Sequence, residues 1–167
     1  LLDVPPAASP FFPSALSAQR DAITARYRAD RPGATEGAIT HAMLTDQLFR
    51  VPQIRLAEAQ ARWQPGWMYL FRWHVPFDPA APPAQNLGAI HAIELGFVFG
   101  NLDLSTVPRS ATRDPAQLAE RRRLSNRVMD AWLSFARSGD PNGARSAGVP
   151  AWPAYTKAKS ATMAWDA

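Results

Sequence analysis

The sequence contains no cysteine, which excludes a disulfide framework and a thiolate-bound metal site. It also lacks any run of the roughly 20 apolar residues that a helix needs to span a bilayer. Lysine is almost absent, because Lys157 and Lys159 are the only two, and the remaining positive charge comes from scattered arginines. A nucleic-acid surface would gather that charge on one face, so the net charge of +4 does not by itself indicate such a partner.

The chain also lacks the marks of a secretory leader. Residues 1–6, Leu-Leu-Asp-Val-Pro-Pro, include no methionine and no basic stretch, so they are not a signal peptide. We expect that the chain begins inside a longer gene product, although removal of a signal peptide would give the same start. The sequence leaves the cellular location open, with a slight preference for the cytoplasm over secretion.

The composition is that of an ordinary globular domain, with 47% of the 167 residues hydrophobic and 19% charged. A chain of this length can bury a real core. Helical spacing of apolar residues and the positions of capping residues predict helices over residues 17–29, 45–49 and 53–63. The second would be capped by Thr45–Asp46, and the turn residues Asp30–Gly33 would end the first.

Residues 67–73, Trp-Met-Tyr-Leu-Phe-Arg-Trp, predict a strand because they form a short, aromatic-rich run. Their nearly continuous apolar character is typical of a strand buried on both faces, in a sheet with helices on each side. The longest predicted helix begins at Asp114–Pro115 and ends at Ser138–Gly139, both suitable boundaries. Arg121–Arg123 would lie on its solvated face. Strand and helices together indicate the α/β class.

Three histidines are candidates for chemistry, and His91 is the strongest. It lies in the glycine-bounded segment 88–100, which follows a long irregular stretch over residues 74–87. Catalytic residues concentrate in loops carried by a rigid scaffold, and an imidazole there can shuttle a proton near neutral pH. His41, before an apolar helical stretch, and His74, at the end of the predicted strand, are interpreted as structural residues.

Metal binding and self-contained nucleophilic catalysis both lack the residues that they need. Glu94 lies three residues after His91, but no second carboxylate–histidine cluster is present, so we interpret Glu94 as a carboxylate that anchors the loop. A serine hydrolase needs G-x-S-x-G at a strand-to-helix turn; the nearest match, residues 144–148, has alanine first and is predicted to be a flexible loop. There is no phosphate loop and no dinucleotide fingerprint, so no cofactor is expected.

The segment Gly88–Gly100, which contains His91, resembles the catalytic-histidine block of the type B carboxylesterases. These are the cholinesterase-like α/β hydrolases, a group that includes bacterial para-nitrobenzyl esterases. Four further blocks resemble the same family in its own order: residues 45–52, Tyr69–Trp73, Asp130–Asn142 and Trp152–Tyr155. The blocks cover most of the chain from about Thr45 onward, and their shared order makes the resemblance specific.

The resemblance implies that the chain is the C-terminal part of an α/β-hydrolase domain, with its last sheet strands and flanking helices, incomplete on its own. Residues 1–44 would be a lead-in and helical segment, and residues 45–167 the histidine-bearing segment. The family's triad runs Ser, acid, His, and its histidine maps onto His91. The serine, the oxyanion hole and the acid would lie upstream. Asp3 is near the expected place of the acid, but its surroundings do not match the acid loop.

For function, the resemblance implies hydrolysis of a small-molecule carboxylic ester, with His91 as general base and no cofactor or metal. Ile93 and Leu87 are candidates to line the pocket. The expected partner is the upstream portion of the same enzyme, and the isolated chain is predicted to be inactive. Two other interpretations stay open. One is a non-catalytic cholinesterase-like interaction domain, which the retained His91 disfavours; the other is an unrelated basic α/β domain that binds nucleic acid.

Overall fold

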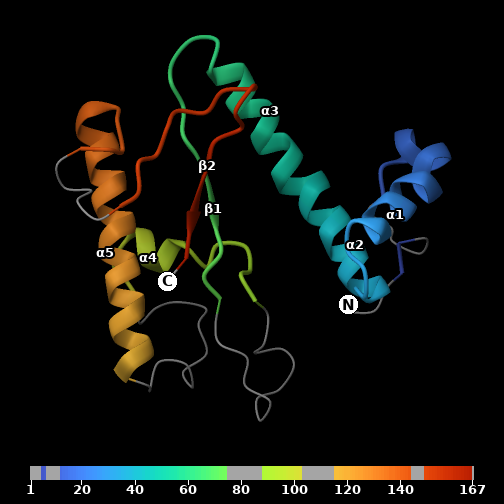
Figure 1. Ribbon diagram of the computed structural model, residues 1–167, viewed down its shortest axis with the longest axis horizontal. Helices are drawn as coiled ribbons and strands as arrows, with labels where there is room; N and C mark the ends of the chain where they lie inside the picture. Colours follow the sequence, from blue (N-terminus) through green and yellow to red (C-terminus); the bar gives the residue numbers. More distant parts are fainter. Residues whose placement is uncertain (1–4, 7–11, 75–87, 103–114, 144–148, 167) are drawn as a thin grey trace. The chain divides into compact units, whose positions relative to one another are not determined.

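A computed structural model describes residues 5–6, 12–74, 88–102, 115–143 and 149–166 of the chain. These residues belong to two compact units, residues 1–63 and residues 64–167 (Figure 1). None of the helices in these ranges is long and apolar enough to cross a membrane. The segment boundary expected between residues 44 and 45 follows family motifs rather than contacts, and it stays a prediction.

The described part of the first unit consists of helices and turns. Its elements are η2 (Ser14–Gln19), α1 (Arg20–Ala29), α2 (Glu36–Thr45), η3 (Asp46–Arg50) and α3 (Val51–Gln60). The helices predicted over residues 17–29 and 53–63 are confirmed as η2–α1 and α3, with shifted ends. As predicted, α1 ends at the Asp30–Gly33 turn, where Gly33 takes the left-handed conformation with φ 81°.

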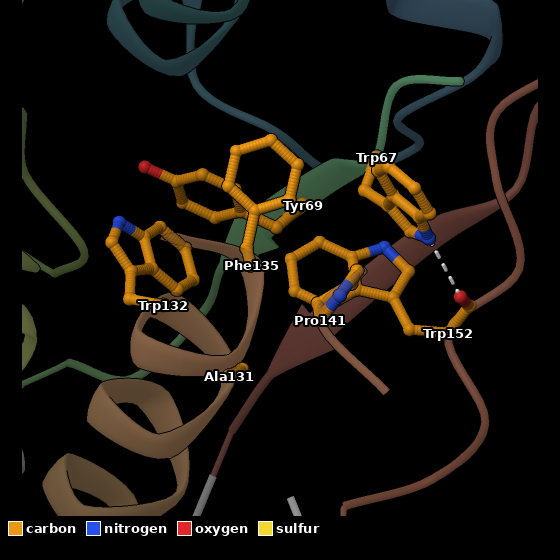
Figure 2. A pocket seen from close by; sticks show the side chains of 7 residues that line it. All are labelled: Trp67, Tyr69, Ala131, Trp132, Phe135, Pro141 and Trp152. Carbon is orange, nitrogen blue, oxygen red and sulfur yellow. Dashed lines mark hydrogen bonds between the residues drawn. The ribbon is translucent and has the colours of Figure 1, made fainter. Parts of the chain in front are cut away.

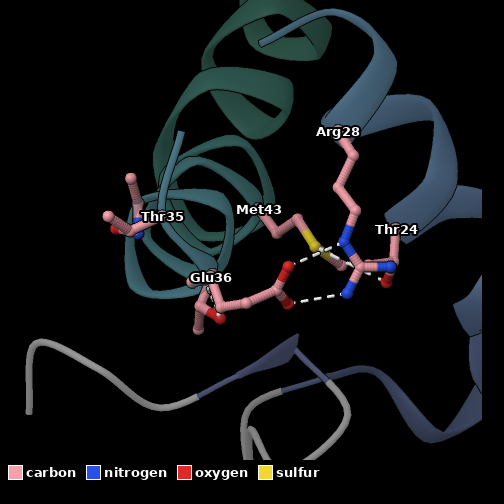
Figure 3. Close-up of polar contacts among 7 residues, drawn as sticks. Thr24, Arg28, Thr35, Glu36 and Met43 are labelled. Atoms are coloured by element: carbon pink, nitrogen blue, oxygen red, sulfur yellow. Dashed lines mark hydrogen bonds and ion pairs between the residues drawn. The ribbon is translucent and has the colours of Figure 1, made fainter. Parts of the chain in front are cut away.

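The predicted cap at Thr45–Asp46 is wrong, because the chain is already helical at this point. The helix that reaches it is α2, which begins at Glu36. Thr35 caps α2, and its side-chain oxygen accepts a hydrogen bond from the Ala38 amide at 3.2 Å. The Arg28 guanidinium donates two hydrogen bonds to the Glu36 carboxylate, at 2.8 and 2.6 Å, and so ties α1 to the first turn of α2 (Figure 3). Thr45–Asp46 has the same capping chemistry as Thr35, so only the pairing of α1 with α2 distinguishes the two positions.

A π-helical turn joins α2 to α3 and allows the helix to pass Pro52. The Val51 amide donates to the Asp46 carbonyl, one residue farther back than in an α-helix. Proline has no amide hydrogen, and in a regular helix its ring would clash with the carbonyl of Leu48. The wider turn of η3 relieves that clash, so Pro52 stands in the first turn of α3 without breaking the helical path.

A hydrogen bond of 2.5 Å runs from the Tyr27 hydroxyl on α1 to the Asp46 carboxylate on η3. Burial of the phenol, followed by the hydrogen bond and the negative charge of Asp46, raises the pKa of Tyr27 from 10.0 to about 12. Because the folded pKa is raised, the contribution of this bond to stability is complete below the ordinary pKa of 10.0. It is lost as the pH rises through about 12.

We therefore expect a Tyr27→Phe variant to lose the part of the alkaline tyrosinate absorbance titration that lies near pH 12. Its free energy of unfolding should be lower than that of the wild-type chain at neutral pH, because the bond to Asp46 is gone. Near pH 12 the two free energies of unfolding should converge. Urea unfolding at both pH values checks this, and a difference that persists unchanged would contradict the assignment.

The second unit is built on a two-stranded parallel sheet. Its elements are β1 (Met68–Phe71), α4 (Leu95–Val98), α5 (Pro115–Ser138) and β2 (Thr162–Trp165). In the sheet, Tyr69 of β1 lies opposite Met163 of β2, and Phe71 lies opposite Trp165. Figure 1 shows the long helix α5 running beside α4, with which it is in contact. This arrangement places two helices against the sheet, as the α/β class predicts.

β1 is not buried on both faces, so that prediction is wrong for the described residues. Tyr69 and Phe71 point toward the helices: the Tyr69 ring lies 5.0 Å from that of Trp132, and the Phe71 ring lies 5.0 Å from that of Phe97. Leu70 alternates to the opposite face and is 47% exposed. The apolar run predicts a second covering layer, and the part of the chain that the structure describes does not contain one.

The described residues of the second unit share a hydrophobic core. Its buried members are Trp73, Ile93, Phe97, Leu102, Leu124, Val128, Ala131, Trp152, Met163 and Trp165. The long predicted helix is confirmed as α5, and Gly139 ends it with φ 73°. Asp114, its predicted N-cap, lies outside the described residues.

The basic run on α5 is solvated only in part. Arg122 and Arg123 are exposed, but Arg121 is 1% exposed, so the predicted solvated face is wrong for this residue. The guanidinium of Arg121 donates through Nη2 to the Leu102 carbonyl at 2.8 Å and lies 5.7 Å from the centre of the Trp73 ring. This hydrogen bond and the aromatic face offset part of the cost of burying its charge.

Candidate functional site

The glycine-bounded segment begins with a tight bend that carries His91. Gly88 has φ 70° and Ala92 has φ 67°, so the backbone visits the left-handed region on both sides of the histidine. The Ile90 amide donates to the Gly88 carbonyl at 3.1 Å, and the Ile93 amide donates to the Ile90 carbonyl at 3.2 Å. These bonds close two successive turns around His91, whose side chain is exposed.

Ala92 is a strained position in an otherwise well-anchored segment. A non-glycine residue in the left-handed region costs about 1–3 kcal/mol and persists only where the surroundings fix it. The residue after Ala92, Ile93, is 3% exposed, and Phe97 is fully buried. These two side chains lie four residues apart and hold the bend to the core, so His91 stands on a fixed support.

The bend lies beyond the carboxyl end of β1. Trp73 follows this strand closely, is 4% exposed, and has its ring 4.9 Å from that of Phe97. The same Phe97 ring contacts Phe71, the last residue of β1, at 5.0 Å. In open parallel sheets, ligands and reacting groups gather outside the carboxyl ends of the strands. The segment that carries His91 is thus fastened, through Phe97, to the edge of the sheet where such folds carry out chemistry.

The structural interpretation of the other two histidines stays a prediction. His41 is exposed on α2, and His74 is exposed with its Nδ1 3.3 Å from the Arg72 carbonyl oxygen. Ile93 is a core residue, so its predicted place in the lining of a pocket is wrong. The remaining sequence candidates, Leu87, Asp3 and the segment 144–148, lie outside the described residues.

Glu94 is half-buried and follows His91 on a turn rather than on a helical face, because the positive φ of Ala92 interrupts helical geometry. Burial, and after it the negative charge of Glu94, raises the pKa of Tyr69 on β1. Among the residues that the structure describes, no three His, Asp or Glu side chains gather in the way that a metal site requires.

An aromatic pocket of about 200 Å³ lies at the opposite, amino end of β1. It is lined by Trp67, Tyr69, Ala131, Trp132, Phe135, Pro141 and Trp152 (Figure 2). The Trp67 indole donates to the Trp152 carbonyl at 3.0 Å, and the Tyr69 and Trp132 rings meet edge to face at 73°. Among the lining residues only Tyr69 can titrate, so we interpret the pocket as a packing surface rather than a place for acid–base chemistry.

Sequence reasoning missed the residues of α5 that bind the segment following the His91 bend. Ser125 of α5 is 2% exposed, and its hydroxyl donates to the Phe97 carbonyl at 2.8 Å. A usable signal was present, because Arg121 and Ser125 are spaced four apart and fall beside the apolar positions Leu124 and Val128. Polar residues inside a buried stripe need hydrogen-bond partners, and such partners are seldom local.

Residues 12–167 match the profile of the carboxylesterase family. The para-nitrobenzyl esterase of Bacillus subtilis (strain 168) is 39% identical over 125 residues, which make up 74% of this chain and 22% of that protein. The phenmedipham hydrolase of Pseudarthrobacter oxydans is 35% identical over 111 residues, 66% of this chain and 20% of that protein. The chain thus spans about a fifth of the length of these relatives.

Solved structures of esterases superpose on the chain. A carboxylesterase of Geobacillus stearothermophilus gives a TM-score of 0.66 with 35% identity, covering 86% of this chain and 28% of its own. A thermophilic PNB esterase gives a TM-score of 0.61 with 34% identity, covering 95% of this chain and 31% of its own. The predicted fold class, a part of an α/β hydrolase, is confirmed by these neighbours, and so is the resemblance to the para-nitrobenzyl esterases.

Proposed function

The chain belongs to the carboxylesterase family, and on that premise we propose that it contributes the catalytic histidine, His91, to a serine esterase. In this proposal, the nucleophilic serine and the acid lie in a segment upstream of Leu1. The observation that carries it is the exposed imidazole on a strained, anchored bend beyond the carboxyl end of β1. The names of the relatives, a para-nitrobenzyl esterase and a phenmedipham hydrolase, support a small carboxylic ester or related acyl compound as substrate.

His91 acts in both halves of the proposed reaction. It first accepts the proton of the serine hydroxyl while the serine oxygen bonds to the ester carbonyl carbon. It then gives that proton to the departing alkoxide, which leaves as the alcohol and yields an acyl-enzyme. In the second half, His91 takes a proton from the attacking water and returns a proton to the serine oxygen as the carboxylic acid leaves.

A general base must be held in a fixed orientation, because a misplacement of about 1 Å can cost roughly 100-fold in rate. The bend meets this demand in two ways. Ile93 and Phe97 fasten it to the core, and the two left-handed positions at Gly88 and Ala92 turn the chain sharply enough to expose the imidazole. Proton transfer between His91 and a serine on another segment requires both a rigid backbone under the histidine and an exposed imidazole.

We also infer where the serine-bearing segment packs. Leu95, the first residue of α4, and Phe99, which directly follows the helix, lie four residues apart and are 50% and 76% exposed. Leu70, on the uncovered face of β1, is 47% exposed. Apolar surface of this kind marks an interaction site. Leu70 faces away from α4, which packs on the other face of β1 through Phe97, so the apolar side chains form two separate surfaces. A segment that brings a hydroxyl to His91 would lie beside Leu95 and Phe99, and we take this partner to be the upstream part of the same enzyme rather than nucleic acid or membrane.

Reconstitution tests the proposal. The chain alone is expected to hydrolyse a para-nitrobenzyl ester no faster than buffer does, and to self-associate through its apolar surface. The complete enzyme, meaning this chain joined to the upstream segment of its own gene, is expected to be active and to react stoichiometrically with a serine-directed organophosphate. Steady-state kinetics measures the hydrolysis, and size-exclusion chromatography measures the self-association.

Three results would speak against this function. Esterase activity of the chain alone would mean that the nucleophile lies within it. An upstream segment in which the serine position carries another residue would instead favour the non-catalytic interaction domain considered from the sequence. A complete enzyme with an intact serine and no esterase activity would reject the ester substrate class.

A further inference from the structure

One face of α5 holds the segment that follows the His91 bend. Ser125 donates from Oγ to the Phe97 carbonyl at 2.8 Å, and Arg121 donates from Nη2 to the Leu102 carbonyl at 2.8 Å. Both donors are buried, at 2% and 1% exposure. They lie four residues apart and so share one side of the helix. Two carbonyls near the ends of the short segment are thus held by two successive turns of α5.

Met129 extends this row by another turn. Its sulfur would lie 2.9 Å from a Cβ added at Gly100, and Gly100 itself has φ 65°. Met129 therefore packs directly on the backbone between the two hydrogen-bonded carbonyls. Three successive turns of α5 contact residues 97–102, in keeping with the close approach of α4 and α5 in Figure 1.

We propose that Ser125 and Arg121 are positioning residues for His91, which act through α4 and do not touch the substrate. This inference rests on the proposed function of His91 as the general base. Two backbone hydrogen bonds connect Phe97 to the bend. The Phe97 amide donates to the Glu94 carbonyl at 2.9 Å, and the Leu95 amide donates to the Ala92 carbonyl at 3.3 Å. A shift of Phe97 is thereby passed to the strained residue next to the histidine.

The buried charge of Arg121 supports a role beyond filling space. A guanidinium at 1% exposure is costly to bury, and an apolar side chain of similar volume would often stabilise a core as well or better. What an apolar residue would lack is the directional bond to the Leu102 carbonyl. The same guanidinium faces Trp73, whose ring also contacts Phe97 at 4.9 Å. One side chain therefore joins the end of β1 and the end of the α4 segment to α5.

The matched pair Ser125→Ala and Ser134→Ala tests the positioning role in the complete enzyme. Ser134 is also on α5, is 6% exposed, and donates to a backbone carbonyl, that of Asp140, at 2.7 Å. It lies near the carboxyl end of α5, past the turns that contact residues 97–102. Both variants should lower the melting temperature, because Ser125→Ala removes one hydrogen bond and Ser134→Ala removes two, the second donated by the Gly143 amide at 2.9 Å. Only Ser125→Ala should lower kcat, by roughly 10- to 100-fold and with KM unchanged.

A second measurement reads the bend without using activity. In Ser125→Ala, hydrogen exchange of the Ile93 and Phe97 amides should speed up and the NMR signals of the His91 imidazole should shift, whereas Ser134→Ala should change neither. Equal loss of kcat in both variants, or unchanged His91 signals in Ser125→Ala, would overturn the positioning role. If His91 proved not to be catalytic, its signals would still respond to Ser125→Ala, so the two proposals can fail separately.

Discussion

Replacing His91 with alanine in the complete enzyme is expected to lower kcat for a carboxylic ester by about 10⁴- to 10⁶-fold, with little change in KM. Without the imidazole nothing takes the serine proton and nothing protonates the leaving alkoxide, whereas the surface that binds the ester is left intact. The remaining rate would come from substrate binding and from the oxyanion donors of the upstream segment. Steady-state hydrolysis of a para-nitrobenzyl ester measures the loss.

His74→Ala is the matched control for this experiment. His74 is also exposed and also lies beyond the carboxyl end of β1. Its Nδ1 lies 3.3 Å from the carbonyl oxygen of the nearby Arg72. Its removal should leave kcat near the wild-type value. If His91→Ala kept near wild-type turnover while His74→Ala lost it, the general base would have been assigned to the wrong residue.

The elements that the sequence predicted well are those set by local chemistry. α5 begins at Pro115, which suits the first turn of a helix, and ends at Gly139, which takes the left-handed conformation. Between them the apolar residues recur at helical spacing. The bend at His91 was also visible, because Gly88 and Gly100 mark positions where the backbone has positive φ. In each case the signal lies within a few residues of the feature.

The features that the sequence did not predict depend on contacts between distant segments. Alanine has no local reason to be left-handed, so Ala92 is explained only by the anchoring of its neighbours in the core. Arg121 looks solvated beside two other arginines until Leu102 and Trp73 are placed against it. The alternating burial of β2, Thr162–Trp165, is a period-two signal, but four residues are too few to recognise without the partner strand.

The candidate site divides in the same way. His91 was selected among three histidines from its glycine-bounded segment and from family blocks in their shared order, both of which can be seen in the sequence alone. The residues proposed to support it, Ser125 above all, were visible only as polar positions beside a buried stripe. Their partners were not visible, because a serine in a helix has the same local appearance whichever carbonyl lies opposite. Sequence thus predicts the group that would react, and the fold is needed to find what holds it.

A second large effect is expected on stability. Trp152→Ala should lower the free energy of unfolding by about 3–5 kcal/mol, a large share of the 5–15 kcal/mol that is typical of a domain. The indole is 4% exposed, and its ring lies 5.7 Å from that of Trp165, 6.1 Å from that of Trp132 and 6.5 Å from that of Tyr69. Its N–H donates to the Met68 carbonyl at 2.9 Å. Alanine leaves a cavity among these rings and an acceptor without its donor.

Two comparisons isolate the cause of that loss in urea unfolding followed by circular dichroism. Trp63→Ala, at a position 82% exposed, should change the free energy of unfolding by less than about 0.5 kcal/mol, and equal costs at both tryptophans would contradict the burial argument. Trp152→Phe keeps most of the ring and loses the N–H, so it should lower the free energy of unfolding by about 1–3 kcal/mol, less than Trp152→Ala does.

Because Trp152 binds the amino end of β1 and the His91 bend packs at the carboxyl end, Trp152→Phe should destabilise the complete enzyme without lowering kcat. The residues that hold the sheet would then be separated experimentally from those that hold the histidine.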